Sequence, residues 1–199
     1  MNGRFYEALV YAARLHEGQR RKGGKVPYVS HLLAVCALVL EAGGTEDEAI
    51  AALLHDGPED RGGREELERI RATFGDEVAH IVEGCSDSLV DTRVTKKAPW
   101  RERKENYLKH LATADASTLL VSVADKLHNA RTTERDVARE GIEFFDNFPE
   151  AGRAGTLWYY HELLAAYGRC PKDPRREPLL DELVAIVGRL QRQPPSPPK

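Results

Sequence analysis

The sequence predicts an all-α fold of about nine or ten helices, and three observations support this prediction. Apolar residues recur at spacings of three and four along most of the chain, which places them on one face of each helix. No segment shows the apolar–polar alternation of a half-buried strand. The length of 199 residues, with 41% hydrophobic and 31% charged residues, suits one soluble domain with a sizeable core.

The first two predicted helices are separated by a basic, glycine-rich loop. Residues 2–17 place apolar side chains on one helical face, whereas residues 18–29 contain glycines and a proline that interrupt helical regularity. We expect the second helix over residues 31–42, with Ser30 as its N-cap and a Gly-Gly pair as its stop.

The third predicted helix has the clearest local signals. Thr45 is a good N-cap, and Glu48 three residues later completes a capping box. An apolar run over residues 49–54 follows and ends at His55-Asp56. Gly57-Pro58 is expected to break the helix there.

The remainder of the chain continues the helical pattern. Further helices are predicted over residues 63–74, 76–86, 99–113, 115–140, 157–167 and 177–191. Trp158, Tyr159 and Tyr160 fit either a core or a ligand pocket. We expect one domain over residues 1–191 and a disordered Pro-rich tail over residues 192–199.

Bulk properties exclude several classes of protein. A net charge of -3 and a sequence pI of about 6.2 argue against general nucleic-acid binding. The three cysteines are far apart, which indicates a reducing, cytoplasmic environment. No apolar stretch reaches membrane-spanning length, and the N-terminus lacks a signal-peptide pattern. The sequence therefore predicts no nucleic-acid or membrane partner, and it leaves open whether the chain forms a homo-oligomer.

A candidate metal site combines residues from three predicted helices. Ionisable groups such as His55 and Asp56 are costly to bury at the end of an apolar run unless they are paired or bind a cation. Together with His31 and Asp125 they offer two imidazoles and two carboxylates, which suit one Mn²⁺, Fe²⁺ or Zn²⁺ ion. The competing interpretations are a helix cap for His31, a solvated helix end for His55-Asp56, and a structural partner for Asp125.

Candidate acid–base residues follow this dipeptide directly. Glu59 and Asp60 could polarise a water molecule and transfer its proton. Pro58 prevents us from assuming regular helical spacing, and the two carboxylates could instead form an acidic turn.

Two basic segments are candidate phosphate-binding sites. Arg21 and Lys22 lie in the glycine-rich loop, where forked guanidinium donors and free backbone N–H groups suit an anion. Residues 96–104 form a second, weaker candidate. A solvated loop and a solvated helix start are the respective alternatives. Among the other histidines, His128 directly precedes Asn129, so we expect these two side chains to face different ways.

Three motifs in this order resemble the HD superfamily of metal-dependent phosphohydrolases. The closest resemblance is to the hydrolase domain of RelA/SpoT proteins and to stand-alone small alarmone hydrolases. The motifs are His16-x-x-Gln19-x-Arg21-Lys22 with Pro27-Tyr28-x-x-His31, then His55-Asp56-x-x-Glu59-Asp60, and finally Asp125-x-Leu127-His128-Asn129-x-Arg131. They span about two thirds of the chain.

This resemblance implies a single HD-domain helical fold and Mn²⁺-dependent removal of the 3′-pyrophosphate from ppGpp or pppGpp. It implies that the substrate is a phosphorylated nucleotide. The implied roles are metal binding by His31, His55, Asp56 and Asp125, water activation by Glu59 and Asp60, and substrate binding by Arg21, Lys22 and Asn129. The alternatives are an HD phosphohydrolase for another nucleotide or NADPH, and a non-catalytic nucleotide-binding module.

The sequence departs from the family pattern at two places. The loop over residues 22–27 is one residue longer than the usual form, which leaves the specificity for guanine open. Gly57-Pro58 is an unusual filling between the His-Asp and Glu-Asp pairs. Nothing after residue 140 resembles a synthetase domain, so we expect no alarmone synthesis by this chain.

Overall fold

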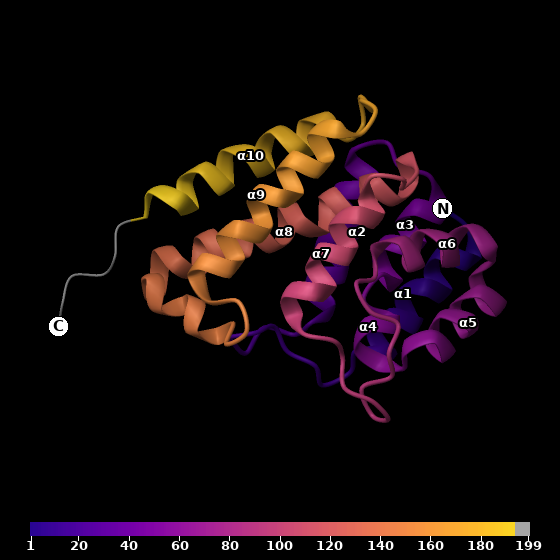
Figure 1. Cartoon of the computed structure of the whole chain (residues 1–199). Helices are drawn as coiled ribbons and strands as arrows, with labels where there is room; N and C mark the ends of the chain where they lie inside the picture. Colours follow the sequence, from indigo (N-terminus) through magenta and orange to yellow (C-terminus); the bar gives the residue numbers. More distant parts are fainter. Residues whose placement is uncertain (194–199) are drawn as a thin grey trace.

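The computed structural model describes residues 1–193, which form ten α-helices and one 3₁₀ helix without a β-strand (Figure 1). The all-α prediction is therefore confirmed for this part of the chain. The predicted disordered tail falls almost wholly on residues 194–199, outside the described residues. The helices are α1 (Gly3–Leu15), α2 (Val29–Glu41), α3 (Glu46–Leu54), α4 (Gly57–Arg61), α5 (Gly63–Phe74), α6 (Asp76–Cys85), α7 (Trp100–Leu111), α8 (Ala116–Glu140), η1 (Ile142–Asn147), α9 (Gly152–Arg169) and α10 (Glu177–Arg192).

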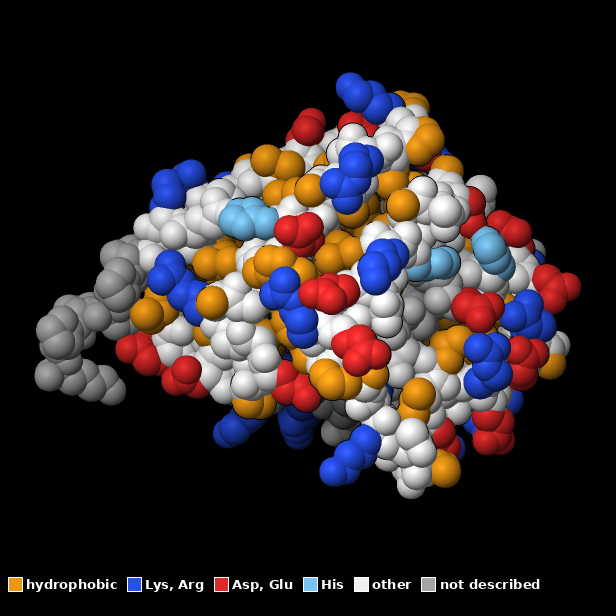
Figure 2. Space-filling view, in the orientation of Figure 1, with side chains coloured by type: hydrophobic (Ala, Val, Ile, Leu, Met, Phe, Trp, Pro, Cys, Tyr) orange, Lys and Arg blue, Asp and Glu red, His pale blue; other side chains and the backbone are white. Residues whose placement is uncertain are grey.

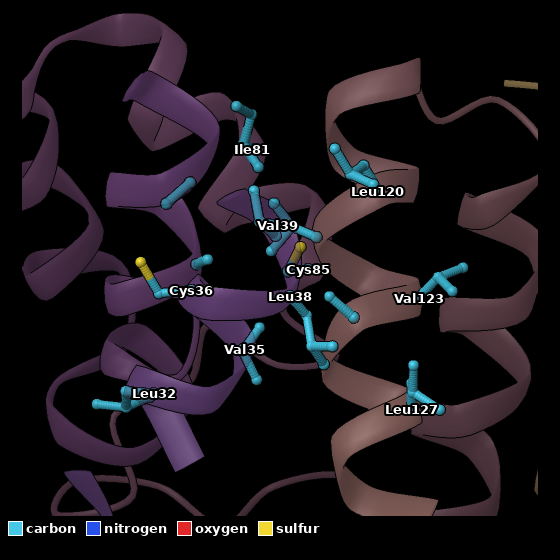
Figure 3. Close-up of a cluster of buried hydrophobic side chains, with 14 of the residues drawn as sticks. Leu32, Val35, Cys36, Leu38, Val39, Ile81, Cys85, Leu120, Val123 and Leu127 are labelled. Atoms are coloured by element: carbon cyan, nitrogen blue, oxygen red, sulfur yellow. The ribbon is translucent and has the colours of Figure 1, made fainter. Parts of the chain in front are cut away.

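Helix α8 lies at the centre of the fold and packs against α2, α3, α6 and α10. Its N-terminal half is apolar and buried on nearly all sides, which explains why this 25-residue helix needs no regular polar face there. Figure 3 shows the side chains that α2 and α8 contribute to this core, with two from α6 behind them. The labelled residues are Leu32, Val35, Cys36, Leu38, Val39, Ile81, Cys85, Leu120, Val123 and Leu127.

The predicted capping box of α3 is confirmed. The Thr45 side chain accepts a hydrogen bond from the Glu48 backbone N–H, and the Glu48 carboxylate accepts one from the Thr45 N–H at 2.7 Å. Glu48 is buried and also accepts two bonds of 3.0 Å from Arg175, in the turn between α9 and α10. One carboxylate therefore begins α3 and fixes a turn that lies 127 residues away.

The Gly-Gly stop of α2 is confirmed as well. Gly43 has a φ of +82°, a left-handed backbone conformation that residues other than glycine rarely adopt. A Cβ atom on Gly44 would lie 2.5 Å from a methyl carbon of Val39, so this position requires close backbone approach. The chain can therefore turn sharply from α2 into the N-cap of α3.

The structure differs from the local predictions at three places. Ser30 does not cap α2, because a turn starting at Pro27 continues directly into the helix and the Ser30 hydroxyl donates to the Pro27 carbonyl at 2.8 Å. Helix α3 does end before Gly57-Pro58, but these two residues begin α4 instead of a loop, with Pro58 in the first turn, where its missing N–H is tolerated. Helix η1 was not predicted, and α9 begins five residues earlier than expected, at Gly152.

Helices α9 and α10 lie together on one side of the molecule, opposite α1, α5 and α6 (Figure 1). Ion pairs from Arg131 to Glu182 and from Arg189 to Glu134 connect α10 to α8. Charged side chains of both signs are interspersed over the face shown in Figure 2. Among the described residues, no helix combines the length and the apolar character that a membrane crossing requires.

Candidate active site

A cavity of about 660 Å³ opens beside α8 and is lined by all the sequence-predicted site residues except His55, which is buried. The glycine-rich loop, α4, η1 and the start of α9 form its other walls. The chemically important lining residues are Arg21, Lys22, His31, Asp56, Glu59, Asp60, Lys104, Asp125, Lys126, His128, Asn129, Tyr159 and Tyr160. Tyr159 and Tyr160 are mostly buried and also line the cavity, so these two residues belong both to the core and to the pocket.

The four predicted metal-binding side chains converge at one point. The Nε2 atom of His31 lies 3.4 Å from an Asp56 oxygen and 3.2 Å from an Asp125 oxygen. The Nε2 atom of His55 lies 3.0 Å and 3.6 Å from the same two oxygens. Helix α2 supplies His31, the junction of α3 and α4 supplies the dipeptide, and α8 supplies Asp125. The structure thus brings together residues that are up to 94 positions apart in sequence.

The donor set fits a divalent cation, because His55 presents a bare nitrogen at this point. Its Nδ1 lies 2.9 Å from the Ala52 carbonyl, which can only accept, so Nδ1 carries a proton and the neutral ring has its lone pair on Nε2. This Nε2 atom is buried and has no hydrogen-bond partner among the described residues. Burial lowers the pKa of His55, but the Asp56 and Asp125 carboxylates outweigh burial and hold this pKa well above its usual range, so the position of Nε2 favours a bound positive charge. Two imidazoles and two carboxylates are a suitable ligand set for such an ion.

Neighbouring polar groups orient the four side chains. The Tyr28 hydroxyl donates to Asp56 at 2.7 Å, and the Asn129 amide donates to Asp125 at 2.6 Å. Lys126 forms an ion pair with the other oxygen of Asp125. Burial alone would raise the pKa of Asp125, but Lys126 and the two histidines outweigh it and hold this pKa well below its usual range. The carboxylate is therefore ionised and ready to bind a cation.

Glu59 and Asp60 lie in α4 and line the cavity next to Asp56. Burial raises the pKa of Glu59, and the nearby Asp87 carboxylate raises it further. Burial and the charge of Asp56 also raise the pKa of Asp60, although Gln19, which donates to Asp60 at 2.6 Å, opposes this. Raised carboxyl pKa values suit proton transfer near neutral pH.

The glycine-rich loop is a closed structure whose basic residues face the cavity. Backbone hydrogen bonds from Arg21 N to Val26 O and from Tyr28 N to Gln19 O close it at 2.9 Å each. The Arg21 guanidinium donates to Asn129 at 2.6 Å. The Lys22 ammonium lies 5.5 Å from the centroid of the Phe148 ring. Both cations therefore line the cavity, where Arg21 is half-buried and Lys22 remains exposed to solvent.

The second basic segment also contributes to the cavity. The Lys97 ammonium lies 3.1 Å from a Glu59 oxygen, and Arg103 lies 3.8 Å from the same atom. Lys104 lines the cavity itself. The alternative of a solvated helix start is therefore wrong for these three cations. Lys97 and Arg103 lie beside the candidate acid–base residue, whereas Lys104 pairs with Asp87.

Sequence reasoning missed the contribution of His128. Its Nδ1 lies 2.7 Å from Nδ1 of His31, while Asn129 contacts Asp125, so both residues face the cluster. The expectation that these two side chains would face different ways was wrong. The four converging side chains lie so close to α8 that neighbouring positions on this helix both contact them. Tyr28 and Gln19 were missed too. All three residues lie within the three sequence motifs, and this membership is the signal that could have identified them.

We predict that Asp87→Asn destabilises the protein in a pH-dependent manner. Asp87 is buried and accepts hydrogen bonds of 2.7 Å and 2.8 Å from Arg103. Burial opposes its ionisation, but Lys104 and Arg103 outweigh burial and lower its pKa to about 2. Because the folded pKa lies below the unfolded one, the ionised carboxylate stabilises the fold above the unfolded pKa. This contribution of about 2 kcal/mol is lost as the pH falls from about 4 to about 2.

The measurement is urea unfolding of both proteins at several pH values. The free energy of unfolding should differ most at pH 7, and the difference should shrink towards pH 3. Asp181→Asn, at an exposed position of α10, is the matched control and should change little. An equal difference at all pH values would contradict the assigned ion pair.

Comparisons with known proteins agree on one family. A model of the HD domain family matches residues 8–157. The Xenopus tropicalis protein named guanosine-3′,5′-bis(diphosphate) 3′-pyrophosphohydrolase MESH1 is 39% identical over 132 residues, which cover 65% of this chain and 69% of that protein. A Myxococcus xanthus GTP pyrophosphokinase is 35% identical over 164 residues, which cover 79% of this chain and 21% of that protein.

A solved structure supports the same relationship. It belongs to a metazoan orthologue of SpoT that is described as hydrolysing ppGpp. It matches with a TM-score of 0.71 and 26% identity, over 95% of this chain and 96% of that one. The Myxococcus protein and a Synechocystis relative, named as a probable guanosine-3′,5′-bis(diphosphate) 3′-pyrophosphohydrolase, are much longer proteins, and this chain spans 21% of each.

Proposed function

Because the chain belongs to the HD domain family, we propose that it is a metal-dependent phosphohydrolase that removes the 3′-pyrophosphate of ppGpp or pppGpp. The observation that carries this proposal is the buried Nε2 of His55, which has no hydrogen-bond partner among the described residues and lies beside His31, Asp56 and Asp125, three residues that line a cavity together with Glu59 and Asp60. The name of the Xenopus relative and the description of the SpoT orthologue support this substrate class.

We propose one divalent cation, most naturally Mn²⁺, held by His31, His55, Asp56 and Asp125. Mixed imidazole and carboxylate donors suit this ion. When bound, it supplies Lewis-acid chemistry, which lowers the pKa of water and offsets charge on phosphoryl oxygens.

The protein's own residues supply the remaining chemistry. Glu59 and Asp60 orient the attacking water and take its proton, and their raised pKa values suit this role. Arg21 and Lys22 bind the anionic groups of the nucleotide, and Asn129 positions the substrate beside Asp125. Holding water and substrate in one cavity of about 660 Å³ lowers the entropic part of the barrier.

The direct test is hydrolysis of ppGpp by protein reloaded with Mn²⁺, with pyrophosphate and single phosphate measured separately. We expect GDP and pyrophosphate in equal amounts, and no turnover after chelation of the metal. Parallel assays with NADPH and with the adenosine counterpart of ppGpp test the substrate specificity that the longer loop over residues 22–27 leaves open. Release of single phosphate, or turnover of NADPH alone, would identify a different HD phosphohydrolase. Metal-loaded protein without turnover on any of these substrates would indicate a non-catalytic module.

A further inference from the structure

His128 is a cavity residue to which the proposed function assigns no role. It lies on α8 between Leu127, which is fully buried, and Asn129, and it is itself only half-buried. Its Nδ1 lies 2.7 Å from Nδ1 of His31, and the two ring centroids are 4.8 Å apart. The described part of the chain offers its ring no other hydrogen-bond partner.

Counting protons on the two rings leaves only one arrangement. The Nε2 atom of His31 faces the Asp56 and Asp125 oxygens, so this is the nitrogen that would bind the cation and must carry a lone pair. The proton of His31 then resides on Nδ1 and is donated to His128. Nδ1 of His128 must accept it, and a neutral histidine that accepts at Nδ1 carries its own proton on Nε2.

The N–H of His128 is therefore directed away from His31 and is available to a molecule in the cavity. Arg21 contacts Asn129, the next residue along α8, so a guanidinium stands on the same part of the wall. A neutral N–H donor beside a guanidinium suits an anionic acceptor such as a phosphate oxygen.

We propose that His128 couples metal binding to substrate binding: its Nδ1 fixes the orientation and tautomer of His31, and its Nε2–H donates to a phosphate oxygen of the nucleotide. This inference rests on the proposed function, since it requires a cation at His31. His128 is thus a positioning residue for the metal site and a binding residue for the substrate.

Three substitutions separate the two roles. His128→Asn keeps an acceptor near the position of Nδ1 but lacks the distant N–H. His128→Gln keeps a donor near the position of Nε2 but lacks the acceptor. His128→Phe lacks both. We expect Mn²⁺ affinity close to wild type for the asparagine variant and about 10- to 100-fold weaker affinity for the other two.

The substrate role is measured separately with ppGpp at saturating Mn²⁺. His128→Asn should raise KM by about 3- to 10-fold, the loss expected for one hydrogen bond, with a smaller effect on kcat. His128→Gln should keep a KM near wild type once enough metal is supplied. Far-ultraviolet circular dichroism and thermal unfolding check that each variant folds.

A third measurement does not depend on activity. In protein labelled with ¹⁵N-histidine and loaded with diamagnetic Zn²⁺, the His128 signals should report an unprotonated Nδ1 and a protonated Nε2. The opposite tautomer, or wild-type Mn²⁺ affinity in His128→Gln, would overturn the positioning role. An unchanged KM in His128→Asn would overturn the donor role. Wild-type protein that binds no metal would instead refute the proposed function itself.

Discussion

Asp125→Ala is expected to abolish stoichiometric Mn²⁺ binding and to reduce turnover of ppGpp severely. Asp125 is the only candidate ligand supplied by α8 among the described residues, and its second oxygen is held by Lys126. Removing it leaves the two histidines with one carboxylate and leaves Lys126 buried without its partner. Loss of about 4 kcal/mol of transition-state stabilisation corresponds to a roughly 10³-fold lower kcat/KM.

Metal content by mass spectrometry and turnover by pyrophosphate release check this expectation. Asp125→Asn preserves the shape of the side chain and separates loss of a ligand charge from loss of packing. Asp181→Ala on the exposed face of α10 removes a carboxylate that does not line the cavity and should bind metal normally. Full metal content and turnover in the Asp125 variants would refute the proposed ligand set.

Glu59→Gln is expected to reduce turnover strongly while leaving metal binding unchanged. Glu59 lines the cavity but is not one of the four converging side chains, and Lys97 holds it at 3.1 Å. Glutamine preserves its size and removes its ability to take a proton. General acid–base catalysis contributes about 10²- to 10⁴-fold, so we expect a kcat lower by about that factor.

The pH dependence of turnover gives a second readout for this variant. Burial and Asp87 raise the pKa of Glu59, so the ionised base forms at higher pH than for an ordinary glutamate. The acidic limb of the wild-type pH–rate profile should therefore lie at higher pH than an ordinary glutamate would give. This limb should change in Glu59→Gln. Glu150→Gln is the matched control, because Glu150 also contacts Arg103 but is exposed. Normal turnover in Glu59→Gln would exclude Glu59 as the base.

Local signals in the sequence predicted most of the fold. The Thr45–Glu48 capping box and the Gly43-Gly44 stop depend on neighbouring residues alone, and both were confirmed. The start of α2 could not be predicted in the same way. Ser30 is a good N-cap by type, but the turn at Pro27 is fixed by the closed loop that precedes it. That closure depends on pairing between residues that local patterns do not connect.

The candidate site, like the fold, could be predicted from the sequence only in part. Ordered motifs identified the side chains that converge, because their types and sequence order are visible in the chain. The roles of Lys97 and Lys104 were not visible, since their partners, Glu59 and Asp87, belong to other segments. Helix η1 has little local signal and is held by packing of Phe144 and Asn147 against Gly23. Only the tertiary structure supplies these contacts.

The spread of the converging side chains over α2, the α3–α4 junction and α8 has a consequence for folding. A cation held by His31 and Asp125 would act as a cross-link that closes a chain segment of more than ninety residues. The unfolded chain has no preassembled site, so such an ion would bind the native state preferentially. At a free concentration 100-fold above its dissociation constant, it would add about 2.7 kcal/mol to the free energy of unfolding. Metal supply would thus govern the stability of the folded protein as well as its chemistry.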